Sequence, residues 1–410
     1  MPSPPSARIF TAMSIFSVVV DGIIHAMSVG EKSEEKTAVD WQALRSQFPA
    51  LEHRVYLNTA GGGAMSSAAV AAARAYYDES LESGDVCFDI WMQRVEAARA
   101  TVARCLGAAP DEIAFVANAS AAMNLVALML TSSDTHVLSA DGEFPSATLP
   151  WLNQGARLSF LPRAADGSIE LADADALIQC DTRVFVGSHV QYQTGFRYDL
   201  GALSAFCEAR RLALVVDATQ SVGAQPIDVQ KTPVDALLFS GYKWAGAGYG
   251  VGVLYMPQHK VAQAGLPMVG WRSTLEPALR EYDTLNLAAH IGAVESGHPV
   301  FASIFALGES LSLLHSIGIA AIAERVDKLT VELHARLDEA GFELASPRDE
   351  CARSSITLIQ VDEASRVQSA LYERGVFVSE AGGRLRVSVH FYNNHADIEQ
   401  FMSALMSVTQ

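Results

Sequence analysis

Lys243 lies at the centre of the segment SGYKWAGAGYGVGVLYM, between Tyr242 and Trp244 and before a glycine-rich run. An amine beside an apolar wall has a lowered pKa, so it can form a Schiff base with an aldehyde and later transfer protons. We therefore predict that Lys243 holds an aldehyde cofactor covalently. The alternative is a surface lysine whose stem lies along apolar surface while its amine stays in water.

Asp217 ends another apolar stretch, VVDATQSVG, and Gln220 follows three residues later. A carboxylate in such a place is costly to bury unless it meets a cation or a hydrogen-bond donor. A protonated pyridine nitrogen would be such a cation, and the carboxylate would then keep the ring an electron sink. Gln220 would face the ring hydroxyl. The alternative is an aspartate that only caps the turn after its strand.

Two further motifs suit anionic groups. In NASAAMN, small residues from Asn118 to Ser120 let a phosphate approach the free amides of a helix start, whose dipole favours negative charge. The alternative there is an ordinary N-cap by Ser120. Arg386, inside the alternating stretch LRVSVHFYNN, presents a planar fork that suits a substrate carboxylate. The alternative for Arg386 is a salt bridge on an exposed strand face.

The segments around these motifs predict strands that alternate with helices. Because the strands are continuous apolar runs, we expect a largely parallel sheet covered on both faces. The predicted strands are 112–118, 135–140, 156–162, 182–190, 212–219, 236–241 and 250–256, and the helices are 64–80, 89–106, 119–130 and 200–210. Ligands of such sheets bind at the carboxyl ends of the strands, where these motifs fall.

The pattern changes after about residue 290. A long helical stretch at 300–340 precedes strands at 354–361 and 384–391 and helices at 363–374 and 396–408, which predicts a compact α+β unit. We predict a mobile tail at 1–35, an N-terminal helix at 36–57 that packs with this unit, a large cofactor domain at 58–289 and a small C-terminal domain at 290–410.

Composition limits the class of protein. Of 410 residues, 50% are hydrophobic and 18% are charged, which is typical of a globular chain. The net charge of −17 argues against a nucleic-acid partner, because phosphate contacts need clustered Lys and Arg. No two of the five cysteines have C-x-x-C spacing, so we expect neither a metal site nor a disulfide framework, and we predict a reducing, cytoplasmic location.

The first residues differ from the rest of the chain. Residues 10–24 are apolar but are interrupted by Asp21 and are short for a membrane span, so we expect no membrane association. A signal peptide, with Arg8 as its basic residue, and a true translation start at Met27 are two alternatives. In either case we expect the segment to lie outside the fold.

The order of Asp217, Gln220, Ser240 and Lys243, with the phosphate turn upstream, resembles the class V aminotransferase family of pyridoxal-phosphate enzymes. That family includes cysteine desulfurases, isopenicillin N epimerase-like proteins and kynureninases. The resemblance covers roughly residues 40–408 and includes YLNTAGGG, EFPSATLPW, SHVQYQTG, SGYKW and ESGHP. It implies an α/β protein of PLP fold-type I, with a mostly parallel seven-stranded sheet in a large domain and a smaller α+β C-terminal domain.

The resemblance also implies roles for individual residues. Lys243 matches the Schiff-base lysine, Asp217 the partner of the pyridine nitrogen and Gln220 the residue near the phenolic oxygen. Four positions lie around the phosphate: Ala119, Ser120, Ser240 and Tyr242. Phe144 falls where a ring stacks on the cofactor; many relatives have His there, and Phe cannot transfer protons.

The remaining implied contacts involve the substrate and a second subunit. Arg386 matches the arginine for the substrate carboxylate, and Gly61 and Tyr192 are further candidates for substrate binding. The segment ESGHP resembles a loop that reaches the phosphate of the neighbouring subunit, with His298 as the contact. The resemblance therefore implies a homodimer with shared active sites.

One departure from the family bears on the reaction. Cysteine desulfurases carry a catalytic Cys on a loop shortly before the arginine strand, whereas GVFVSEAGGRLRVS has none and Cys351 lies well upstream. We therefore predict a desulfurase-like lyase that breaks a C–S bond of an amino acid by β-elimination without a Cys nucleophile. An aminotransferase or an epimerase is the alternative, and kynureninase-like cleavage is also open. Lys243 and Asp217 argue against a non-catalytic binding protein.

Overall fold

The computed structural model describes residues 39–132, 134–164, 166–280 and 282–409. Trp41–Gln410 forms one compact unit. The predictions of a mobile tail at 1–35, of a signal peptide and of a start at Met27 lie outside the described residues.

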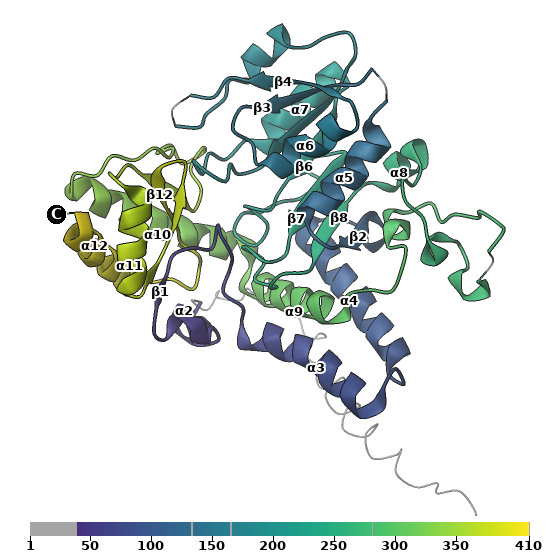
Figure 1. The fold of residues 1–410 in the computed structure, drawn as a ribbon, viewed down its shortest axis with the longest axis horizontal. Coiled ribbons are helices and arrows are strands. Elements are labelled where there is room, and N and C mark those ends of the chain that lie inside the picture. Colours follow the sequence, from purple (N-terminus) through teal and green to yellow (C-terminus); the bar gives the residue numbers. More distant parts are fainter. Residues whose placement is uncertain (1–38, 133, 165, 281, 410) are drawn as a thin grey trace, which may run out of the picture. The chain divides into compact units, whose positions relative to one another are not determined.

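A seven-stranded sheet forms the centre of the large part of the protein (Figure 1). Its strand order is β2-β8-β7-β6-β5-β3-β4, and β8 alone runs antiparallel to its neighbours. The strands are β2 (Ile113–Val116), β3 (His136–Ala140), β4 (Arg157–Leu161), β5 (Thr182–Ser188), β6 (Ala213–Asp217), β7 (Ala236–Ser240) and β8 (Gly252–Tyr255). The predicted mostly parallel sheet is confirmed.

Helices cover both faces of this sheet. Successive side chains of a strand point to opposite faces, so Val215 packs with α5 on one side while Leu214 and Val216 join α4 and α7 on the other. The helices are α3 (Ser67–Ser83), α4 (Phe88–Leu106), α5 (Ala119–Leu130), α6 (Pro145–Asn153), α7 (Leu200–Arg210) and α8 (Gln258–Ala264). This two-sided burial explains why the strands read as unbroken apolar runs.

The C-terminal part is a smaller α+β domain. Its antiparallel sheet has the order β11-β12-β9. Its elements are α10 (Ile319–Glu339), β9 (Ile356–Ile359), α11 (Ala364–Glu373), β10 (Val376–Phe377), β11 (Ser379–Ala381), β12 (Arg384–Ser388) and α12 (His395–Thr409). Single 3₁₀ turns connect elements elsewhere, at Pro49–Leu51, Pro110–Glu112, Leu171–Ala176, Trp271–Ser273, Pro277–Leu279 and Ile291–Val294.

The N-terminal segment contacts this smaller domain. α2 (Trp41–Arg45) is followed by β1 (Val55–Tyr56), which pairs in parallel with β10. The Arg45 guanidinium binds the Asp397 carboxylate at 2.8 and 2.9 Å. These contacts join the N-terminal segment to the C-terminal part of the sequence. The predicted domain boundaries at 57 and 289 stay predictions.

The predicted helical stretch at 300–340 contains two helices. It forms α9 (Phe301–Ile317) and α10, which meet at an angle of 79°. Gly318 lies between them with a φ of 91°, a backbone conformation that favours glycine. Within the described ranges no single helix is long and apolar enough to cross a membrane, and this bent pair meets those criteria only when both helices are taken together.

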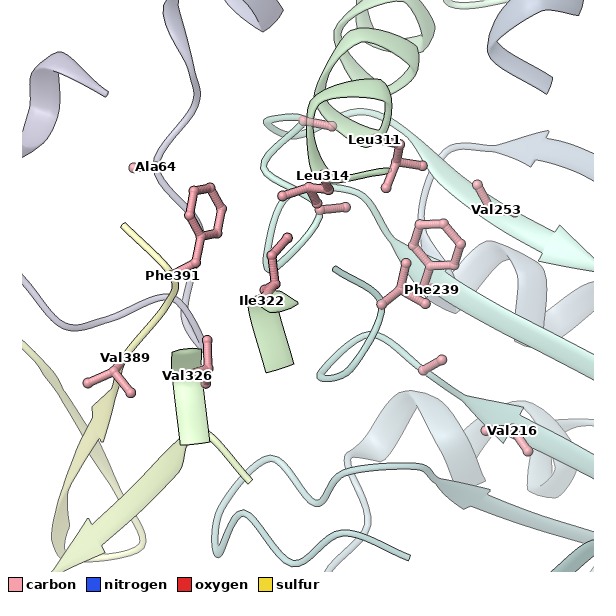
Figure 2. Close-up of a cluster of buried hydrophobic side chains, with 14 of the residues drawn as sticks. Ala64, Val216, Phe239, Val253, Leu311, Leu314, Ile322, Val326, Val389 and Phe391 are labelled. Atoms are coloured by element: carbon pink, nitrogen blue, oxygen red, sulfur yellow. The ribbon is translucent and has the colours of Figure 1, made fainter. Parts of the chain in front are cut away.

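One hydrophobic core runs from the large sheet into the smaller domain (Figure 2). Phe239 and Val253 from the sheet and Leu311 from α9 lie at one end of it, and Val326 from α10 and Val389 lie at the other. Each of these side chains is at most 1% exposed. This shared core packs residues of the smaller domain against residues of the large sheet.

The glycine run at 61–63 lies against the backbone of Lys243. The Gly63 amide donates to the Tyr242 carbonyl at 2.8 Å. A Cβ atom on Gly63 would stand 2.0 Å from the carbonyl oxygen of Lys243, whereas one on Gly62 would come no closer than 3.4 Å, to the Tyr249 hydroxyl. Only a residue without a side chain fits at 63, so this loop fixes the backbone that carries Lys243.

We therefore expect Gly63→Ala to destabilise the protein by about 1–3 kcal/mol, because the new methyl group overpacks the contact with Lys243. Gly62→Ala is the matched control in the same loop and should change stability by less than about 0.5 kcal/mol. Urea unfolding followed by tryptophan fluorescence measures both. Equal stability of the two variants would contradict the close contact.

Candidate active site

A pocket lies at the carboxyl ends of β5, β6 and β7, beside the starts of α5 and α6. Of the residues predicted for the site, all but Arg386, Gly61 and His298 line it. The lining residues are Ala119, Ser120, Phe144, Ser146, Ser188, Val190, Tyr192, Asp217, Thr219, Gln220, Ser240, Tyr242 and Lys243. Five segments far apart in the sequence thus meet at the sheet edge where ligands of such folds bind.

Asp217 is a buried carboxylate at the end of a central strand. It is 7% exposed, and its Oδ1 accepts a hydrogen bond from the Thr219 amide at 2.9 Å. Burial raises the pKa of this carboxyl, while the nearby positive charge of Lys243 acts in the opposite direction. No ion pair joins Asp217 to another described residue, so a cation in the pocket would relieve an unfavourable burial.

Lys243 presents its amine to the same pocket. Its Nζ lies 5.9 Å from the ring centre of Phe144 and 5.6 Å from that of Tyr242. Burial lowers the pKa of Lys243 to about 8, with Asp217 opposing and Arg386 reinforcing the effect. A substantial fraction of this amine is therefore neutral near physiological pH, as a nucleophile or a base must be.

The start of α5 carries the polar groups predicted for a phosphate. Asn118 caps the helix, since its Oδ1 accepts from the Ala121 amide at 2.9 Å. The alternative that Ser120 is the N-cap is therefore wrong. The Ser120 hydroxyl instead contacts the Ser146 hydroxyl at 2.7 Å, and Ser240 Oγ accepts from the Ala119 amide at 2.9 Å.

Gln220 is fixed at both ends of its amide. Its Oε1 accepts from the Trp244 indole at 2.8 Å, and its Nε2 donates to the Ala60 carbonyl at 3.1 Å. An amide nitrogen carries two hydrogens, so one N–H remains for a ligand. The same side chain ties the N-terminal loop to the segment that holds Lys243.

Arg386 lies on β12 of the smaller domain, and its charge acts on Lys243 in the pocket. It is 8% exposed, so it does not lie on an exposed strand face as the alternative supposed. Its Nε donates to Ser379 Oγ at 3.0 Å and its Nη1 to the Tyr192 carbonyl at 2.8 Å. Burial lowers the pKa of Arg386, and nearby Tyr192 and Tyr242 oppose this effect. Oxygen atoms of a ligand could therefore accept hydrogen bonds from the remaining N–H groups of Arg386.

Two predicted residues stand apart from the pocket. Gly61 packs on the Asn58 side chain, where a Cβ atom would come within 2.7 Å of Oδ1. His298 packs on Phe88 and Trp271, at ring distances of 5.4 and 5.2 Å, and lines a separate cavity of about 750 Å³. The predicted contact of His298 with a neighbouring subunit stays a prediction.

Sequence reasoning missed Ser146, Ser188, Thr219 and Glu143. Glu143 lies behind the pocket and accepts from the Ser188 amide at 3.0 Å and from the Ser188 hydroxyl at 2.5 Å. Burial, reinforced by the charge of Asp217, raises the pKa of Glu143 to about 7. An acidic residue directly before Phe144, three residues after an apolar strand, is the signal that could have revealed it.

Comparison with known proteins gives the family. Residues 55–401 match the family described as Aminotransferase class-V. The chain belongs to the class V aminotransferase family. It is therefore a PLP-dependent enzyme, and pyridoxal 5'-phosphate is the cofactor expected in this fold.

Relatives of this class V enzyme are described with different activities. It is 27% identical to an uncharacterized aminotransferase, YcbU, of Bacillus subtilis, over 89% of this chain and 97% of that protein. A probable cysteine desulfurase of Pyrococcus abyssi is 29% identical over 76% and 82% of the two chains. The structure of the cystine C–S lyase C-DES with its product cysteine persulfide matches this one with a TM-score of 0.83 and 22% sequence identity. The match covers 89% of this chain and 100% of that chain.

The pocket of this class V enzyme fits the family cofactor chemically. The buried carboxylate of Asp217 calls for a cation, which a protonated pyridine nitrogen supplies. The amine of Lys243 is partly neutral and can bond to an aldehyde. The hydroxyls of Ser120 and Ser240 at the start of α5 suit a phosphate.

We expect the stability of the cofactor-free enzyme to fall as pH rises through about 7, because of Glu143. The pKa of Glu143 in the folded protein lies above the ordinary 4.5. Its contribution to the free energy of unfolding is therefore complete below pH 4.5 and is lost as pH rises through about 7. Glu143→Gln should remove this loss, which corresponds to roughly 3 kcal/mol. Urea unfolding at pH 5 and pH 8.5 measures the difference between the two proteins.

Glu373→Gln, at an exposed position on α11, is the control and should follow the native protein at both pH values. If the gap between Glu143→Gln and the native protein stayed constant from pH 5 to pH 8.5, Glu143 would not change its charge there.

Proposed function

We propose that this enzyme is an amino-acid lyase of the desulfurase-like kind, which breaks a C–S bond by β-elimination without a Cys nucleophile. The bound cofactor supplies an electron sink for the negative charge that develops at the substrate's α-carbon. Lys243 would hold the cofactor and would take the α-proton of the substrate. Asp217 holds the ring nitrogen in its protonated state, and Arg386 binds the substrate's carboxylate in two parallel hydrogen bonds.

The hairpin before Arg386 carries this proposal. β11 and β12 are joined by Gly382 and Gly383 alone, and both have positive φ, at 60° and 77°. Two residues of this kind form the tightest common hairpin turn, so no loop extends there that could bring a thiol over the substrate. A persulfide on a mobile Cys is therefore no part of the proposed reaction.

The positions of the cysteines support the same conclusion. None of the five is among the residues that line the pocket. Cys351 is exposed and lines another cavity, together with His189 and Arg197. Elimination needs no protein thiol, because the sulfur leaves with the electrons of its bond to carbon.

An aminotransferase or an epimerase is the second candidate. Both reactions start with removal of the α-proton by the same lysine, and a relative from Bacillus subtilis is described as an aminotransferase. Phe144 beside Lys243 favours elimination over an epimerisation that uses two acid–base groups, because this side chain cannot return a proton to the substrate carbon, whereas transamination needs only the lysine. The homodimer with shared active sites and the cytoplasmic location stay predictions.

Product analysis on a panel of amino acids tests the proposal. We expect pyruvate, ammonia and a free thiol or sulfide from sulfur-bearing substrates, without need of an acceptor keto acid. A keto acid formed only with an acceptor would indicate transamination, and loss of optical activity without pyruvate would indicate epimerisation. Either result would contradict the lyase.

Two variants test the residue roles in the same assay. Lys243→Ala should abolish turnover and the absorbance band near about 420 nm that borohydride bleaches. Arg386→Ala should keep that band and raise the KM about 10- to 100-fold, as expected for a lost charge-assisted hydrogen bond. Full turnover by either variant would contradict its assigned role.

A further inference from the structure

Tyr192 occupies a position between the cofactor pocket and Arg386. Its ring meets that of Phe144 edge-on, with centres 5.2 Å apart and planes at 83°. Its carbonyl accepts from Arg386 Nη1 at 2.8 Å, and its hydroxyl lies close enough to act electrostatically on that guanidinium. The side chain is half-buried, and the hydroxyl makes no hydrogen bond to any residue that the structure describes.

The other titratable groups around the pocket have different places. Asp217 lies at the end of β6 and accepts from the Thr219 amide, and Glu143 accepts hydrogen bonds from Ser188. The Tyr242 ring stacks flat on Tyr249, with centres 4.4 Å apart and planes at 19°. Tyr192 is therefore the O–H group that stands beside both the non-titratable Phe144 and the arginine proposed for the substrate carboxylate.

A C–S elimination has a requirement that Lys243 alone does not meet. The leaving sulfur carries the bonding electrons away as a thiolate, and a proton supplied as the bond breaks lowers the barrier for basic thiolates. We propose, on the basis of the lyase function above, that Tyr192 is a catalytic residue that gives its phenolic proton to the departing sulfur.

The proton and electron balance of this step is complete. Lys243 takes the α-proton, the C–S bond breaks, and the sulfur leaves with the bonding pair. The Tyr192 O–H bond breaks and its proton joins the sulfur, so a neutral thiol departs. The Arg386 cation stabilises the phenolate, which recovers through water the proton that Lys243 removed. Water then converts the remaining fragment to pyruvate and ammonia.

Leaving groups of different basicity test this role. S-phenylcysteine releases a weakly basic thiolate that needs little help, whereas S-methylcysteine releases a strongly basic one. In the cofactor-loaded enzyme, Tyr192→Phe should reduce kcat/KM for S-methylcysteine about 100-fold or more, within the range of general acid catalysis. For S-phenylcysteine the reduction should be less than about threefold, because its thiolate leaves without a proton.

Two controls separate proton transfer from packing. Tyr242→Phe removes the other phenol near Arg386 and should change both rates by the same factor. In Tyr192→Phe, exchange of the substrate α-proton with deuterium oxide and the Kd for pyridoxal 5'-phosphate should match the native enzyme. These two readouts report Lys243 and the cofactor site, not the leaving group.

Equal losses for both substrates in Tyr192→Phe, or loss of α-proton exchange, would overturn the acid role and assign Tyr192 to binding. If the native enzyme itself releases neither thiol nor pyruvate from either substrate, the lyase function fails and the role of Tyr192 fails with it. Because that outcome is read in the native enzyme alone, the two failures are distinguishable.

Discussion

The site depends on two groups of opposite charge that the fold holds in one apolar pocket. Asp217 ends a central strand, its carboxylate accepts a hydrogen bond from the Thr219 amide, and burial raises the pKa of that carboxyl. Lys243 follows the next strand, β7, and burial lowers its pKa to about 8. The buried carboxylate of Asp217 and the buried amine of Lys243 are both unfavourable without a partner. One cofactor with a cationic ring nitrogen and an aldehyde gives each of them a partner.

The surrounding architecture keeps these groups in place. The glycine loop at 61–63 packs against the Lys243 backbone, and Gln220 ties this loop to Trp244. β12 brings Arg386 from the smaller domain to the carbonyl of Tyr192. The proposed substrate site thus combines residues from both parts of the chain, which share one hydrophobic core.

Residue types at the ends of apolar strands made much of the sheet and of the site predictable from the sequence. Asp217 and Lys243 follow apolar strands, and in a parallel sheet such strand ends meet at one edge. The bend at Gly318 was missed because its flanks are both apolar and helical, and a single glycine does not reveal an angle. Glu143 and Ser188 escaped notice because their importance comes from a contact between segments 45 residues apart. The alternative of an N-cap at Ser120 was wrong because Asn118, which is an equally good cap, holds that position.

Reduction of the cofactor-loaded enzyme with borohydride, followed by peptide mass mapping, tests the central claim most directly. The account predicts that the reduced phosphopyridoxyl group is found on the Nζ of Lys243 and that Asp217→Ala, made in parallel, strongly weakens cofactor binding. Labelling of a different lysine, or undiminished cofactor affinity without the carboxylate at 217, would contradict it.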